Sequence, residues 1–219
     1  MNVSNNLVEA ARDLRYLLSR GYKREAAIRF VAERHKVTSE ERCILMRAVY
    51  DEAEADNRRR KLISIDKIRG ETVSIDGYNL LITVESMLSN RLLIQGDDYI
   101  TRDVSAVFGK HRITEITTRA LNMILQRLKG QDPNEVHFAY DKQVSKSGEL
   151  AYKTREMMAK LQLKGTATTA LKADIATLRS GGVAISSDSF VVQKSTRILD
   201  LAGELASEAS YSNILRLPH

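Results

Sequence analysis

The sequence has no tryptophan, one cysteine and no long apolar run, and each scarcity excludes a class of protein. Cys43 has no second cysteine to pair with, so an intramolecular disulfide is impossible. A lone thiol in a chain rich in Lys and Glu is typical of a reducing cytoplasm. Apolar runs fall short of the ~20 residues that a membrane span needs, and residues 1–13 show no basic-then-apolar signal pattern. We therefore expect a soluble cytoplasmic protein with no membrane partner.

Several common kinds of catalytic site also lack the residues that they require. The four histidines are scattered and no His/Cys cluster suggests zinc, so we expect none of them to be a metal ligand: His35, His111, His137 and His219. The G-x-x-x-x-G-K-[ST] spacing of a Walker A loop is missing. No Ser-His-Asp or Cys-His set is evident, which disfavours a nucleophilic protein side chain.

Positive charge is unevenly distributed along the 219 residues. The net charge is +6, and residues 1–70 hold 16 of the 34 Lys and Arg residues but only 11 of the 28 Asp and Glu residues. A basic segment beside a nearly neutral one is typical of a polyanion-binding arm attached to a catalytic body. A solvated helical surface explains the same charge equally well.

The chain divides into a helical segment at 1–68 and a mixed segment at 69–219. Apolar residues with a 3.6-residue period predict helices over 5–20, 24–34 and 39–49. Thr38 and Glu41 have capping-box spacing at the start of the third. The basic run Arg58–Lys61 is either a solvated helix end or a contact to a phosphate backbone.

The segment 69–219 alternates short β-rich runs with helical stretches. Strands are predicted at 72–75, 92–94, 136–140, 183–186 and 198–199, with helices at 114–129, 149–161, 189–195 and 203–214. Alternation of this kind predicts an α/β fold with a parallel sheet flanked by helices.

Three of the predicted strands are followed by an aspartate. Asp76, Asp141 and Asp188 come at or directly after the strand ends, and ligands in open α/β sheets bind beyond the carboxyl ends of the strands. A single aspartate there is often only a helix cap. Three carboxylates packed together repel one another unless a cation or protons neutralise them, and carboxylates with water favour Mg²⁺ or Mn²⁺. The sequence therefore predicts an acidic metal site.

Further polar residues extend this hypothesis without settling it. Asp98, Asp103 and Glu85 each compete for the place of a fourth acid, and Arg102 in the same loop is suited to orienting a phosphate. The segment Ser145-Lys146-Ser147 leads into a helix, where backbone N–H groups bind anions. The alternatives are a plain polar turn, a surface charge and an ordinary helix N-cap.

The segment Ile75-Asp76-Gly77-Tyr78-Asn79 resembles the first motif of the NYN branch of PIN-like nucleases, in which an asparagine follows the first-strand aspartate. Asp141 and Asp188 resemble the later metal-binding acids of that fold. The whole chain also resembles an uncharacterised archaeal family, a domain of unknown function, through Leu17–Tyr22 and Asp141–Gly148. The resemblance implies a PIN-like, Rossmann-like sheet preceded by a small helical domain.

The combined hypothesis is a metal-dependent endoribonuclease. Asp76, Asp141 and Asp188, with Asp103, would hold Mg²⁺ or Mn²⁺, and Asn79 would orient a carboxylate or the substrate. Phosphate contacts would come from Arg102, Arg112, Ser145, Lys146 and Ser147. With only 5% aromatic residues, RNA binding would be mainly electrostatic. The rival hypotheses are a non-catalytic RNA-binding protein on the same fold, a metal-dependent phosphohydrolase, and a scaffold that forms homo-oligomers.

Overall fold

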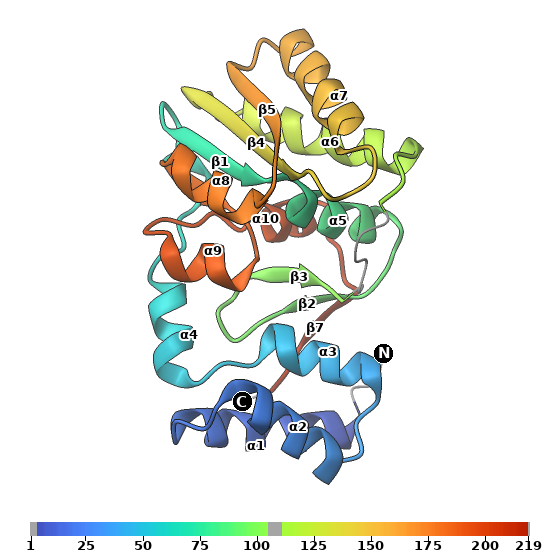
Figure 1. The fold of residues 1–219 in the computed structure, drawn as a ribbon, viewed down its shortest axis with the longest axis vertical. Helices are drawn as coiled ribbons and strands as arrows, with labels where there is room; N and C mark the ends of the chain where they lie inside the picture. Colours follow the sequence, from blue (N-terminus) through green and yellow to red (C-terminus); the bar gives the residue numbers. More distant parts are fainter. Residues whose placement is uncertain (1–3, 105–110, 219) are drawn as a thin grey trace.

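The computed structural model describes residues 4–104 and 111–218. Its N-terminal part is helical (Figure 1), and the helices are α1 Asn5–Ser19, α2 Arg24–Arg34, α3 Ser39–Ala48 and α4 Glu52–Arg59, followed by a 3₁₀ helix at Ile65–Ile68. The Thr38 hydroxyl accepts a hydrogen bond from the Glu41 backbone N–H, and the Glu41 carboxylate accepts one from the Thr38 backbone N–H, so the predicted capping box is confirmed. The sequence reading missed α4, whose eight residues carry little apolar periodicity.

The centre of the α/β part is a four-stranded sheet in which every pairing is parallel. The strand order is β5-β4-β1-β6, and the strands are β1 Thr72–Asp76, β4 Glu135–Asp141, β5 Gly165–Ala170 and β6 Val183–Ile185. Helices α5 Gly77–Leu88, α6 Glu115–Lys129 and α7 Ser147–Lys160 pack together on one face, and α8 Ala173–Ser180 packs on β1 and β4 from the other. The predicted parallel sheet flanked by helices is confirmed.

A second sheet of three strands lies apart from the first (Figure 1). It has the order β3-β2-β7, with β2 Leu93–Gln95, β3 Thr101–Asp103 and β7 Ile214–Arg216. Helices α5 and α10 Leu201–Glu208 lie between the two sheets, and α9 Ser189–Lys194 follows β6. The helix predicted over 203–214 is therefore wrong beyond Glu208. Residues 198–199 form only isolated bridges of Ile198 with Leu62 and Ala184.

The hydrophobic core is divided between the two parts of the chain. One cluster lies around the parallel sheet, and a second lies among α1–α3 and includes Ile94 of β2 and Leu217 beside β7. The N-terminal helices thus share their core with the small sheet, although the boundary between 1–68 and 69–219 stays a prediction. Within residues 4–104 and 111–218, no helix is both long and apolar enough to cross a membrane.

Candidate functional site

The three predicted aspartates line one pocket at the carboxyl edge of the parallel sheet. β1 lies between β4 and β6, so the residues at their carboxyl ends meet at one place. Asp76 ends β1, Asp141 ends β4, and Asp188 follows β6 by three residues. They line a cavity of about 350 Å³ together with Tyr78, Asn79, Ile82, His111, Val144, Ala173 and Asp174.

Asp174 is a fourth acid in this pocket, and the sequence reading missed it. It lies in the first turn of α8, directly after β5. The strand has the sequence Gly-Thr-Ala-Thr-Thr-Ala and contains no large apolar residue, so its hydrophobic pattern is weak. The rule that found the other aspartates would have found Asp174 once the threonine-rich strand was recognised.

Asp76 is the most buried acid of the pocket, and its environment disfavours the charged form. Burial raises the pKa of Asp76 to about 7, and the negative charge of Asp188 adds to the rise, with a smaller contribution from Asp174. Hydrogen bonds from the Asn79 amide (3.4 Å) and the Ser186 hydroxyl (3.2 Å) act in the opposite direction. The charges of the other acids thus affect the pKa of Asp76, as expected of carboxylates close enough to share one cation.

Gly77 of the motif has a steric role. A Cβ at Gly77 would overlap the ring of Tyr140, which packs directly over this position. Tyr140 lies on β4, and its hydroxyl forms a 2.9 Å hydrogen bond with Thr154 of α7. Glycine thus allows α5 to begin immediately after Asp76 while the neighbouring strand carries a large ring.

Asn79 fixes the segment that carries Asp188. Its Oδ1 accepts hydrogen bonds from the Ser187 backbone N–H (2.7 Å) and from the Ser187 hydroxyl (2.8 Å). Asp188 is the N-cap of α9, and its Oδ1 accepts from the N–H groups of Phe190 and Val191. These contacts tie the first and last predicted acids to each other through the loop after β6.

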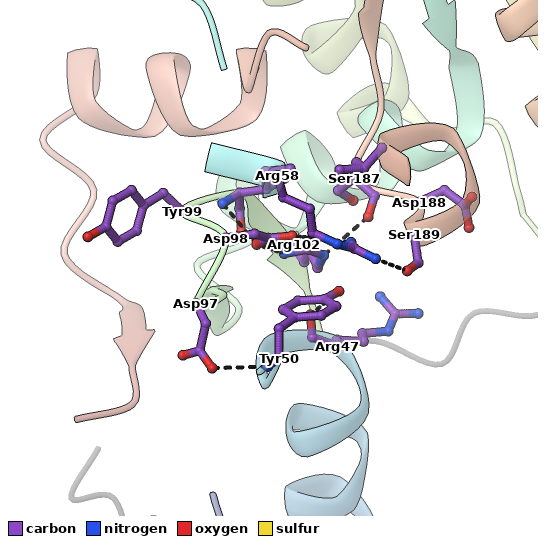
Figure 2. Close-up of polar contacts among 12 residues, drawn as sticks. Arg47, Tyr50, Arg58, Asp97, Asp98, Tyr99, Arg102, Ser187, Asp188 and Ser189 are labelled. Atoms are coloured by element: carbon purple, nitrogen blue, oxygen red, sulfur yellow. Dashed lines mark hydrogen bonds and ion pairs between the residues drawn. The ribbon is translucent and has the colours of Figure 1, made fainter. Parts of the chain in front are cut away.

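Two buried arginines also bind this segment (Figure 2). Arg58 of α4 donates to the Ser189 hydroxyl at 2.6 Å, and Arg102 of β3 donates to the Ser187 carbonyl at 3.1 Å. Both guanidinium groups also bind the buried carboxylate of Asp98, and Arg58 stacks 4.1 Å from the centre of the Tyr50 ring. We call Arg58, Arg102, Asp98 and Tyr50 the arginine cluster.

Arg102, Asp98 and Asp103 do not line the acidic pocket, contrary to the roles proposed from sequence. Arg102 is buried and binds both Asp98 oxygens, at 2.7 and 2.6 Å, so its guanidinium is committed within the chain. Asp103 lies on β3 and pairs with Arg47 of α3 at 3.1 Å. These residues are close together in the sequence, which suggested a phosphate site. The sequence does not show that α3 and α4 cover this loop.

The predicted phosphate-binding residues have different surroundings. Lys146 has a left-handed backbone (φ 64°) before α7, and its ammonium lies 3.6 Å from Glu149. Ser145 and Arg112 are exposed, whereas Ser147 is buried at the start of α7. Arg112 adjoins His111 of the pocket, and Ser145 follows Val144, which also lines it. These residues lie next to the cavity lining without belonging to it.

The basic run Arg58–Lys61 is largely used within the chain. Arg59 pairs with Glu52 and Asp56, and Lys61 donates to the Val192 and Gln193 carbonyls. The sequence predicted either a solvated helix end or a phosphate contact for this run. The structure shows a third role, contacts within the chain, of which Arg58 in the arginine cluster is one. Three of the four basic side chains, those of Arg58, Arg59 and Lys61, therefore bind other residues of the chain.

Glu85 forms a buried hydrogen-bonded chain with residues that the sequence reading did not connect to it. Its carboxylate accepts from the Thr117 hydroxyl at 2.6 Å and contacts His111 Nε2 at 3.0 Å. His111 lines the acidic pocket, although the sequence reading treated it as an isolated histidine. No spacing signal could have found this pair, because the residues lie 26 positions apart.

The donor chemistry of the pocket fits a hard divalent cation, but the acids are not gathered as a three-ligand site. In the described ranges, no group of three or more His, Cys, Asp or Glu side chains is arranged to hold a metal. Mg²⁺ usually keeps several waters and uses one or two protein carboxylates plus substrate phosphates. Asp76 and Asp188, whose charges interact, fit that simpler requirement.

Residues 65–204 match a family described as a domain of unknown function, DUF5616, and residues 6–61 match a second, described as a protein of unknown function, DUF434. The first match covers most of the chain. The chain belongs to the DUF5616 family. The four pocket aspartates all fall within the segment that matches DUF5616.

The chain is also similar to an uncharacterised protein of the archaeon Methanocaldococcus jannaschii, MJ0935. The two are 33% identical over 201 residues, which is 91% of this chain and 96% of the relative. The similarity therefore extends over the DUF434 and DUF5616 segments together. No solved structure matches the chain.

Proposed function

We propose that this DUF5616 protein is a metal-dependent ribonuclease with a PIN-like fold. The observation that carries the proposal is the convergence of four aspartates on one pocket at the carboxyl edge of a parallel sheet, namely Asp76, Asp141, Asp174 and Asp188. The sequence resemblance of Asp76–Asn79 to the first PIN-like motif supports it independently, because the motif begins at the central acid of that pocket.

The pocket residues would divide the work as follows. Asp76 and Asp188 would hold Mg²⁺ or Mn²⁺, which would supply an activated water and stabilise negative charge on the phosphate. Asp141 and Asp174, at the other walls of the pocket, would bind and orient water molecules. Asn79 would keep Asp188 in place through Ser187. The raised pKa of Asp76 means that this carboxylate must lose its proton before it serves as a ligand.

The N-terminal part of the chain would supply RNA affinity. It carries the excess of Lys and Arg, and three aromatic side chains on or between α1 and α2 are exposed, namely Tyr16, Tyr22 and Phe30. Exposed rings beside basic residues are suited to stacking with single-stranded bases. Aromatic stacking would then add to the electrostatic contribution that we expected from the charge alone.

A direct test is cleavage of a labelled single-stranded RNA by the full chain in Mn²⁺ or Mg²⁺, with EDTA as the negative control. Asp76→Asn is expected to lose at least ~10³-fold in rate, because it removes a ligand of the metal that activates the water, while the far-UV circular dichroism stays the same. Asp132→Asn, at an exposed turn, is the matched control and should cleave normally. Equal activity of the two variants would exclude the proposal.

A second candidate function is a non-catalytic RNA-binding protein on the same fold. The excess of Lys and Arg over Asp and Glu in residues 1–70 supports RNA binding without any catalytic site. In that case the wild-type chain binds RNA and leaves it intact with every divalent cation. A small-ester phosphohydrolase would instead hydrolyse p-nitrophenyl phosphate and ignore long RNA.

A further inference from the structure

Tyr78 and His111 line the acidic pocket, and each carries a buried polar atom without a hydrogen-bond partner. Both side chains are 7% exposed and both line the cavity. In the described part of the chain, six buried side-chain N or O atoms lack a hydrogen-bond partner, and two of them are Tyr78 Oη and His111 Nδ1. Buried polar atoms are costly to leave unpaired. Two at one pocket therefore point to a group supplied from outside.

The two rings are held firmly by their neighbours. The centre of the Tyr78 ring lies 5.4 Å from that of His111 at an interplanar angle of 61°, and 5.3 Å from that of Tyr140 at 75°. Edge-to-face contacts at these distances are favourable. On the far side, His111 Nε2 is fixed by Glu85, and Thr117 fixes Glu85. The unpaired atoms are thus displayed by rigid side chains.

Chemistry assigns opposite hydrogen-bonding roles to these two atoms. An ionised carboxylate only accepts hydrogen bonds, so the contact with Glu85 places the imidazole proton on Nε2. With that proton on Nε2, the neutral form of an imidazole carries its lone pair on Nδ1. The phenolic hydroxyl of Tyr78 is able to donate a hydrogen bond. The residues that line the pocket thus include one acceptor and one donor, on rings whose centres lie 5.4 Å apart.

A hydroxyl group complements this pair better than an anion does. It can donate to His111 Nδ1 and accept from Tyr78 Oη, and it carries no charge. A free phosphate oxygen would meet the lone pair of Nδ1 and the carboxylate of Asp141, which lines the same pocket. We propose that Tyr78 and His111 form a subsite for a ribose 2′-hydroxyl, with Glu85 as the positioning residue of the imidazole.

This inference rests on the proposed action on RNA and adds a substrate preference to it. The 2′-hydroxyl is the group that distinguishes RNA from DNA at a single site. A site built to hydrogen-bond it rejects the deoxy analogue, because the protein atoms are then left unpaired. The acids would serve the phosphodiester, and Tyr78 with His111 would read the sugar.

The experiment compares RNA and DNA 12-mers of one sequence on the full-length protein. Binding is measured by fluorescence anisotropy in EDTA, and cleavage is measured with Mn²⁺. The wild type should prefer RNA in both, and Tyr78→Phe should lower affinity and kcat/KM for RNA by about tenfold while leaving DNA unchanged. Tyr152→Phe, at an exposed tyrosine of α7, is the matched control and should keep the preference.

The Tyr78→Phe variant allows an effect on RNA binding to be distinguished from an effect on folding. Tyr78→Phe removes only the unpaired hydroxyl and keeps the ring, so its Tm should equal or exceed that of the wild type. Imidazole ¹⁵N spectra give a second readout. Nδ1 of His111 should shift when the RNA 12-mer is added and not with DNA. His137, which makes the equivalent 3.0 Å contact to Glu135 away from the pocket, should not shift.

Each outcome decides between the two proposals. Cleavage of RNA and DNA with equal efficiency, or an equal loss for both in Tyr78→Phe, overturns the subsite and leaves nuclease activity standing. A preference for RNA in binding that Tyr78→Phe abolishes, without cleavage in any metal, supports the subsite and overturns the nuclease. A chain that neither binds nor cleaves either 12-mer overturns both.

Discussion

The acidic pocket and the arginine cluster are two polar regions that both contact the loop after β6, and their buried charges are compensated differently. In the arginine cluster, Asp98 is wholly buried and its two oxygens bind Arg102, with Arg58 adding a third contact (Figure 2). In the pocket, Asp76 has acids for neighbours and a raised pKa. The carboxylate of Asp98 is neutralised by arginines of the chain, whereas the proposed function assigns the neutralisation of the pocket acids to a bound cation.

The difference separates structural from functional polar groups. A buried ion pair with its hydrogen bonds made holds elements together but has no capacity left for a ligand. Unpaired atoms such as Tyr78 Oη and carboxylates that repel one another cost stability unless something binds. The two regions therefore predict opposite responses to mutation, since breaking the cluster should destabilise the fold and neutralising the pocket should stabilise it.

The largest expected effect is on the arginine cluster. Arg102→Met leaves the carboxylate of Asp98 buried beside one remaining arginine, and we expect a loss of about 3–5 kcal/mol in the free energy of unfolding. Urea denaturation followed by circular dichroism measures it. The exposed Arg112→Met is the control and should change stability by no more than ~0.5 kcal/mol. A loss below ~1 kcal/mol for Arg102→Met would show that the cluster is not structural.

The pocket should respond in the opposite direction, with a defined dependence on pH. The folded-state pKa of Asp76, about 7, lies above its unfolded value of ~3.9. The native state therefore holds the extra proton between these values, and stability falls as pH rises from about 4 to 7. In EDTA at pH 8, Asp76→Asn should be more stable than the wild type by a few kcal/mol, and the gain should disappear near pH 4. A gain that does not change between pH 4 and 8 would contradict the burial argument.

A smaller effect is expected where the two regions meet. Ser189→Ala removes the hydrogen bond from Arg58 beside Asp188, with an expected cost of about 1 kcal/mol in stability. If the arginine cluster positions Asp188, the Mn²⁺ concentration needed for half-maximal cleavage should also rise several-fold, because side chains that orient a metal ligand affect the affinity for the metal. Ser180→Ala, which loses a hydroxyl bond to Ala176 within α8, is the control. An unchanged Mn²⁺ requirement would limit the cluster to a structural role.

Sequence reasoning predicted the parallel sheet and three of the four pocket acids because strand ends are local signals. Asp76, Asp141 and Asp188 each follow an apolar run that identifies its own strand. Asp174 was missed because β5 is built from threonine, alanine and glycine, and such a strand has no marked apolar face. Asp174 was missed because the strand before it was not predicted, and not because an aspartate at a strand end was judged wrongly.

The roles of Arg102, Asp98 and His111 depended on contacts far apart in the chain. The sequence predicted a phosphate contact for Arg102 and a candidate fourth acid or a plain polar turn for Asp98, because it does not show that Arg58 of α4 and Tyr50, which follows α3, pack against them. His111 gained its role only through Glu85, on a different helix. Tertiary packing decides whether a polar side chain is bonded within the chain or open to a ligand. The periodicity of the sequence carries no information about this packing.

The measurement that tests the central claim most directly is anomalous scattering from crystals of the full chain soaked in Mn²⁺. The account predicts an anomalous peak in the pocket, bonded to Asp76 and Asp188 at the ~2.0–2.6 Å of oxygen ligands, which is lost in Asp188→Asn crystals. A well-ordered pocket without a peak at saturating Mn²⁺, or with a peak only elsewhere, would contradict the assignment of this acidic pocket as a metal-dependent active site.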